Sequence, residues 1–330
     1  MTINLCNGIP IFIRILGARI FGPAVTAGAL LVGACACGDA SIEEEKIGSV
    51  QLDIPPREQW RNGHGYCGET SLQSIALHYG AWVSQQVVRD AAGGELLLAV
   101  NETKALDALH FDYENWDYEK TSAPQFQQFA TWLKGQMVQG HPVIFAAYLS
   151  ESSDLEYDHI MPAVGIDFRR ASGYDAQDTL SFNTNFGGRV RRTFGASWGT
   201  RQSCINDSNA GGCIPQGVDY GIAVLGITDR KRATLPVRLV MARNAEPNVS
   251  LGESAETMQT TVTVSGLTKG RSYALLRYDK AKNVPTDAMA AGFLASKYDK
   301  RVDFTATGNT WAESDTFDSD GVAYYRCVPR

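Results

Sequence analysis

The sequence predicts an α+β protein in which a helical half precedes an antiparallel sheet half, followed by a small all-β sandwich. Apolar residues recur at three- and four-residue spacing within 67–137, as they do on one face of a helix. Short apolar and β-branched runs fill 143–227, and a further series of alternating runs bounded by turn residues fills 232–330. Segregated helices and sheet define the α+β class, and about a hundred residues of short strands are typical of a sandwich.

The helical half begins at Cys67. Gly63, Gly65 and Gly68 favour a turn at this point, and the apolar positions that follow predict a helix that ends at Gly80. Other helical segments are predicted at Ser84–Ala92, Leu96–Leu109 and Pro124–Met137.

The sheet half follows as a series of short strand-like runs. They are predicted at Val143–Leu149, His159–Asp167, Thr179–Asn185, Arg189–Phe194 and Tyr220–Ile227. The charged run Asp229–Arg232 then marks a boundary, so we expect one domain at 58–231 and the sandwich at 232–330. Within the sandwich, the stretch TVTVSGLTKGRSYALLRYD resembles one hairpin of fibronectin type III modules.

The first 37 residues differ from the rest of the chain. Arg14 and Arg19 precede an apolar, small-residue run at 20–36, the pattern of a secretory signal peptide at 1–37. A retained membrane anchor helix is the alternative, because the run approaches the length of a membrane span.

The end of this segment allows two forms of processing. The residues before Cys35 resemble a bacterial lipobox, which predicts lipidation of Cys35 and membrane attachment through that lipid. Simple cleavage after Ala36 fits nearly as well. In both cases we expect an exported protein, secreted or anchored in the cell envelope, with a linker at 38–57.

Charge and cysteine content restrict the partners. A net charge of −6 without a basic run argues against nucleic-acid binding. Zinc is not expected because HxH, HExxH and CxxC spacings are absent, and no cofactor is predicted.

Cys204 and Cys213 enclose a short polar loop and predict a disulfide. Cys37 and Cys327 are either a second pair or free thiols.

Cys67 is the candidate nucleophile. A thiol at a helix N-terminus meets free backbone N–H groups, which favour the thiolate and lower the pKa of the thiol. A catalytic thiolate needs a base, normally histidine. Of the five histidines, His159 alone opens an apolar strand after an acidic loop.

Three motifs then carry a resemblance. YCGETSLQ at a helix start, DHIMPAVGID, and a strand that ends in NTNFGG resemble, in this order, the papain-like cysteine peptidases of the C39-like branch. The resemblance covers about residues 50–228. It implies a papain-like fold, with Cys67 as nucleophile, His159 as general base and acid, and Asn183, or alternatively Asn185, as the residue that orients the imidazole. It also implies an oxyanion donor at Gln59, or alternatively at Asn62.

The expected function is therefore hydrolysis of peptide or amide bonds through a Cys-His-Asn triad and an acyl-enzyme, with a peptide or protein as substrate. The alternative is an inactive papain-like surface protein that binds partners through its cleft or its sandwich. A sugar-binding role for the C-terminal part is a third hypothesis, based on five aromatic residues. These are Tyr273, Tyr278, Trp311, Tyr324 and Tyr325.

Overall fold

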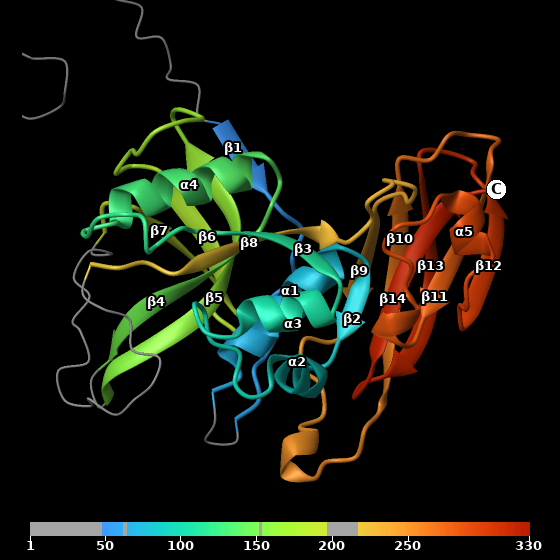
Figure 1. Ribbon diagram of the computed structural model, residues 1–330, viewed down its shortest axis with the longest axis horizontal. Coiled ribbons are helices and arrows are strands. Elements are labelled where there is room, and N and C mark those ends of the chain that lie inside the picture. Colours follow the sequence, from blue (N-terminus) through green and yellow to red (C-terminus); the bar gives the residue numbers. More distant parts are fainter. Residues whose placement is uncertain (1–47, 62–64, 152–153, 197–216) are drawn as a thin grey trace, which may run out of the picture. The chain divides into compact units, whose positions relative to one another are not determined.

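The computed structural model describes residues 48–61, 65–151, 154–196 and 217–330. Within these residues the protein is mostly β, with three antiparallel sheets and short helices (Figure 1). The predicted class, a papain-like α+β arrangement with a following sandwich, is wrong. The region predicted as helical also supplies strands, and strand pairing depends on hydrogen bonds between distant segments that the local periodicity does not show.

The largest sheet has seven strands in the order β3-β8-β4-β5-β6-β7, with β1 paired to β5. Its strands are β1 (Gly48–Gln51), β3 (Phe111–Asn115), β4 (Val143–Glu151), β5 (Asp154–Phe168), β6 (Thr179–Asn183), β7 (Arg189–Thr193) and β8 (Gly221–Ile227). The five strands predicted between 143 and 227 are present. β1 lies inside the segment predicted as a linker, and β4 and β5 extend into the stretch predicted as an acidic loop.

Two smaller sheets contain the C-terminal strands. One has the order β13-β10-β9 and the other β12-β11-β14-β2. Their strands are β2 (Ala81–Val83), β9 (Val237–Met241), β10 (Thr257–Ser265), β11 (Ser272–Tyr278), β12 (Lys300–Thr305), β13 (Thr310–Asp318) and β14 (Val322–Pro329). β2 pairs with β14, and Trp82 lies opposite Ala323. The described residues all belong to one compact unit. The boundary at 231/232 stays a prediction, and β2 pairs across it.

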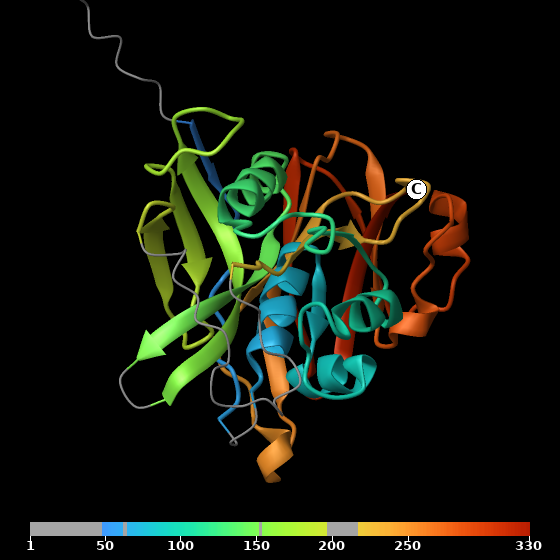
Figure 2. The same ribbon diagram turned by 60° about the vertical axis from the view of Figure 1, so that its left-hand side comes forward.

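The described α-helices are α1 (Cys67–His78), α2 (Gln85–Ala92), α3 (Glu102–Ala108), α4 (Phe126–Val138) and α5 (Ala290–Leu294). α1 contacts β5 of the large sheet as well as β2 and β9, so it lies between the sheets (Figures 1 and 2). In the described part of the chain, no helix has both the length and the apolar character needed to cross a membrane.

Burial on both sides explains the composition of α1. Every residue from Cys67 to Leu77 is buried. Leu72 and Ile75 share one apolar core with Leu276 and Tyr324 of the C-terminal strands. A helix enclosed in this way must satisfy its polar side chains by hydrogen bonds within the protein. These bonds create the candidate site.

The aromatic residues of the C-terminal part belong mostly to this interior. Four of the five proposed for sugar stacking are at most 2% exposed: Tyr273, Tyr278, Tyr324 and Tyr325. Trp311 is partly buried and stacks on Phe304, with ring centroids 4.1 Å apart. The aromatic residues on which the sugar-binding hypothesis rests therefore do not form an exposed surface for stacking on a sugar.

Candidate active site

Cys67 is the first residue of α1, and its side chain is 9% exposed. Gly68 follows because the loop after α2 passes close to the helix start. A Cβ at residue 68 would clash with the carbonyl oxygen and side chain of Leu96. Glycine at residue 68 therefore lets the loop after α2 pack against the helix start, directly beside the Cys67 thiol.

A buried ion pair holds the turn before Cys67. Glu69 accepts hydrogen bonds from Arg89 Nε at 2.8 Å and from the N–H of Leu96 at 3.1 Å. The Arg89 guanidinium lies 3.4 Å from the centre of the Tyr66 ring and donates to the carbonyl of Gly65. Burial raises the pKa of Glu69, and Arg89 opposes this effect. The sequence did not predict a role for Arg89 at this site, because that role depends on where α2 packs.

His159 is fully buried in β5, and its Nε2 lies 2.8 Å from the carbonyl oxygen of Thr184. A carbonyl only accepts hydrogen bonds, so Nε2 carries the proton and Nδ1 is the basic nitrogen. The ring stacks on Phe186 at 5.2 Å between centroids, with 4° between the planes. Burial lowers the pKa of His159, and the bond to Thr184 partly opposes this. The imidazole is therefore neutral near pH 7 and held in one tautomer.

The two candidate orienting asparagines bind elsewhere. Asn183 Nδ2 donates to the carbonyl of Ile54 at 3.2 Å, and its Oδ1 accepts from Arg189 Nε at 3.1 Å. The backbone carbonyl of Thr184 orients the His159 ring, which is the role that the resemblance implied for the Asn183 side chain. The identity of the side chain at residue 184 could not predict this contact, because every residue has a backbone carbonyl.

Asn185 instead connects the helix start to the histidine strand. Its Nδ2 lies 2.9 Å from the carbonyl of Cys67, 2.9 Å from Ser71 Oγ and 2.8 Å from the carbonyl of Ile160. Ser71 Oγ also donates to the Cys67 carbonyl at 2.7 Å. Asn185 adopts φ +61°, a left-handed conformation that asparagine tolerates better than most residues. These bonds bring Cys67 beside the residue that follows His159.

Gln59 lies beside these groups. Its N–H donates to the carbonyl of Asn185 at 2.8 Å, and Glu58 forms a β-bridge with Phe186. Gln59 Oε1 is buried without a hydrogen-bond partner among the described residues. Asn62, the alternative oxyanion donor, lies outside the described residues.

The thiol is protonated in this environment. Burial raises the pKa of Cys67 to about 11, and the nearby Glu69 carboxylate adds to the rise. Backbone hydrogen bonds from Ile160 and Gly68 act in the opposite direction but are weaker. The expectation of a lowered thiol pKa at the helix N-terminus is therefore wrong, because desolvation of the thiolate outweighs the helix terminus. The resting pair is a thiol and a neutral imidazole.

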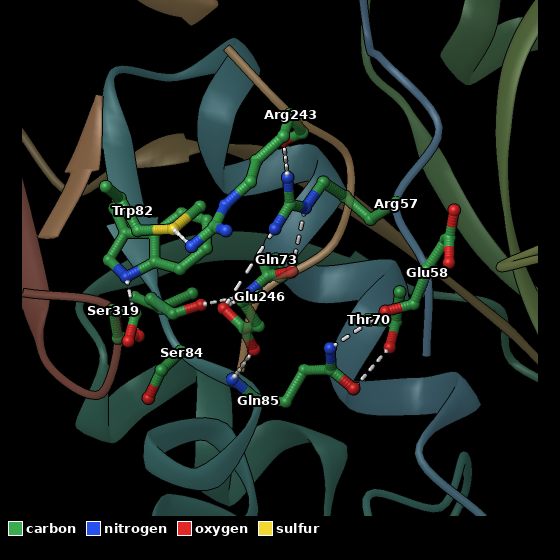
Figure 3. Close-up of polar contacts among 12 residues, drawn as sticks. Arg57, Glu58, Thr70, Gln73, Trp82, Ser84, Gln85, Arg243, Glu246 and Ser319 are labelled. Atoms are coloured by element: carbon green, nitrogen blue, oxygen red, sulfur yellow. Dashed lines mark hydrogen bonds and ion pairs between the residues drawn. The ribbon is translucent and has the colours of Figure 1, made fainter. Parts of the chain in front are cut away.

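A buried polar network anchors the segment that carries Gln59 (Figure 3). Arg57 is fully buried and donates from Nε to Gln73 Oε1 of α1 at 3.0 Å and from Nη1 to the carbonyl of Arg243 at 2.6 Å. Glu246 Oε2 accepts from Gln73 Nε2 at 2.9 Å and lies 4.0 Å from Arg57 Nη2. The segment before the site is thus tied to the loop between β9 and β10.

Gln85, at the start of α2, completes this network (Figure 3). Its Oε1 accepts from the N–H of Trp60 at 3.0 Å and from Thr70 Oγ at 2.9 Å. Its own N–H donates to Glu246 Oε1 at 3.2 Å. Every partner lies in a different element, so the spacing of residues along the chain could not predict the network.

The remaining cysteines and possible metal sites add little to the candidate site. Cys35, Cys37, Cys204 and Cys213 lie outside the described residues, whereas Cys327 is free and fully buried in β14. No cluster of three or more potential metal ligands occurs in the described part of the chain. Four cavities of that part have neither Cys67 nor His159 in their walls.

No known protein-family model matches this chain, and no curated protein sequence matches it significantly.

Proposed function

We propose that the protein is a cysteine-dependent hydrolase of peptide or amide bonds, exported from the cell, with Cys67 as nucleophile. The observation that carries this proposal is that the Cys67 thiol at a helix start lies beside the backbone N–H of Ile160, the residue that follows His159, whose ring has Nδ1 as its basic nitrogen. A nucleophile with an adjacent base that is itself held by a third group is the common requirement of acyl transfer.

The raised pKa of the thiol determines how the reaction starts. Cys67 transfers its proton to His159 Nδ1 as its sulfur forms a bond to the substrate carbonyl carbon, and the carbonyl π electrons move to the oxygen. Collapse of this intermediate breaks the C–N bond, and Nδ1 returns the proton to the leaving amine. Water, deprotonated by the same nitrogen, then releases the acid and restores the thiol.

Two groups of donors support the developing oxyanion. The N–H groups of Cys67 and Gly68 belong to the first turn of α1, where backbone donors lack intrahelical acceptors. The side-chain amide of Gln59 is the second donor that we assign. Preorganised donors of this kind are each worth about 2.7–4 kcal/mol in the transition state.

The burial of Cys67 and His159 also supports a second candidate function. Cys67 is 9% exposed, His159 is fully buried and the thiol is protonated, which is typical of a structural cysteine. In this case the protein binds a partner and catalyses nothing.

The test is cleavage of labelled casein and of a peptidyl-coumarin library by the full chain. We expect Cys67→Ala to abolish cleavage and His159→Gln to reduce it about 100-fold or more, because general base catalysis contributes about 10²–10⁴. Cys327→Ala is the matched control for loss of a buried thiol, and it should retain activity. If folded protein cleaves no probe and mass spectrometry detects no acyl group on Cys67, the binding function replaces the proposal.

A further inference from the structure

A cavity of about 600 Å³ lies at the opposite end of α1 from Cys67. Its wall includes His78, the last residue of α1, together with Arg326 of β14, Ser265 of β10 and Arg232 of the loop before β9. Cys67 and His78 are eleven residue steps apart along the helix, which corresponds to about 16 Å. The cavity is therefore a different place from the candidate active site.

Arg326 is the buried positive group of this wall. Its side chain is 6% exposed, and Nη2 lies 3.3 Å from Asp229 Oδ2. Its Nε–H is buried and has no hydrogen-bond acceptor among the described residues. A buried guanidinium N–H without an acceptor is unfavourable, so an oxygen atom of a ligand would satisfy it.

Arg232 supplies a second guanidinium. It is exposed, and its side chain makes no ion pair or hydrogen bond with the described parts of the protein. Its φ is +49°, a region that residues other than glycine seldom adopt, and its N–H donates to the carbonyl of Asp229 at 2.9 Å. The turn thus holds, at the wall of the cavity, an arginine whose guanidinium group has no partner among the described residues.

Neutral polar groups complete the wall. His78 Nδ1 is buried without a hydrogen-bond partner among the described residues. Thr263, Ser265 and Thr310 line the cavity, and their hydroxyl groups too have no partner side chain or carbonyl in the described part of the chain. These groups can donate to, or accept from, a ligand that also carries hydroxyl or amino groups.

The acidic groups of the cavity are already bound. Asp229 pairs with Arg326 and accepts from the N–H and hydroxyl of Thr234, and Asp112 Oδ1 accepts from Thr228 Oγ at 2.7 Å. The third arginine of the wall, Arg238, pairs with Asp53 at 2.9 Å. The wall therefore suits one small anionic group and not a polyanion.

We propose that this cavity is a binding site for a small ligand with one oxyanion group, a carboxylate or a phosphate. The guanidinium groups of Arg232 and Arg326 bind the oxyanion, and the hydroxyl groups with His78 bind the polar remainder. Guanidinium is the side chain best matched to carboxylate and phosphate, because its N–H groups form a planar fork.

The test is isothermal titration of the full chain with inorganic phosphate and, separately, with lactate, which carries one carboxylate and a hydroxyl group. We expect saturable binding of at least one of them. Arg232→Ala should weaken it about tenfold or more, since hydrogen bonds to charged groups typically contribute that factor or more. Arg230→Ala is the matched control, because Arg230 lies two residues away, carries the same charge and does not line this cavity.

Three outcomes decide the proposal. Saturable binding that is weakened by Arg232→Ala, and also by the double substitution Thr263→Val with Ser265→Ala, supports it, and the preferred anion identifies the ligand class. Equal weakening by Arg230→Ala and Arg232→Ala overturns it, because general charge screening then explains the binding. No saturable binding of either anion also overturns it. Cys67→Ala should leave the titration unchanged, so this result does not depend on the proposed hydrolysis.

Discussion

The carbonyl oxygen of Thr184 lies 2.8 Å from His159 Nε2 and thereby fixes which nitrogen of the ring is basic. A backbone carbonyl orients the imidazole through a fixed dipole, whereas a side-chain amide can rotate away. The bond survives any substitution at residue 184 that preserves the backbone.

The first prediction concerns alkylation of Cys67 by iodoacetamide. The thiol has a raised pKa of about 11, so the fraction of thiolate is small at neutral pH and grows until the pH passes this value. We expect the rate to rise steadily from pH 7 to pH 10 without a plateau below pH 8. Mass spectrometry of the peptide that contains Cys67 measures this rate, and Cys327→Ser removes the other described thiol. A plateau near pH 6 or 7 would contradict the protonated resting state.

Phe186 should control the protonation of His159. The exposed ring of Phe186 stacks on the imidazole, and burial lowers the pKa of that imidazole. In Phe186→Ala water reaches the ring, so we expect the pKa of His159 to rise toward the ordinary value of about 6.5. NMR titration of the ring protons measures the change. Val190→Ala, which removes another exposed apolar side chain, should leave the pKa unchanged.

Gly68 tests how closely the loop after α2 packs on the helix start. Gly68→Ala places a Cβ against the carbonyl oxygen of Leu96. We expect a loss of about 1–3 kcal/mol in the free energy of unfolding, the usual cost of overpacking. Gly65→Ala is the control, because a Cβ there meets nothing within 4 Å. Urea denaturation compares the two, and equal losses would refute the packing argument.

Glu246 should make stability depend on pH. Burial raises its pKa to about 7, and Arg57 opposes the rise only in part. A carboxyl group with a raised pKa in the folded state contributes stability that is complete below its unfolded pKa of about 4.3 and is lost as the pH rises through about 7. Glu246→Gln removes this dependence. We therefore expect the variant to be destabilised more, relative to the wild type, at pH 5 than at pH 8.

Urea denaturation at both pH values measures this difference. Glu256→Gln is the control, since Glu256 is an exposed carboxylate beside the same loop and pairs with Arg243 at the surface. Its effect should be the same at pH 5 and pH 8. A constant effect of Glu246→Gln across the two pH values would show that Glu246 does not titrate in this range.

The sequence by itself determined the local elements. The helix starts at Cys67, as the glycine-rich turn and the apolar spacing predict, and the five strands between 143 and 227 lie where short apolar runs predict them. These features depend on neighbouring residues, so a single sequence contains the information. The motif NTNFGG likewise marked the segment that binds both the helix start and the histidine, although it did not reveal which atom does so.

Only the tertiary structure decided the fold class and the chemistry of the site. β2 pairs with β14 across about 240 residues, and β3 joins β8 across about 110, pairings that local periodicity does not encode. The orienting group is the backbone carbonyl of Thr184, which has no side-chain signature. The pKa of Cys67 rises because the packed chain removes water from the thiol, and this desolvation is a property of the whole fold.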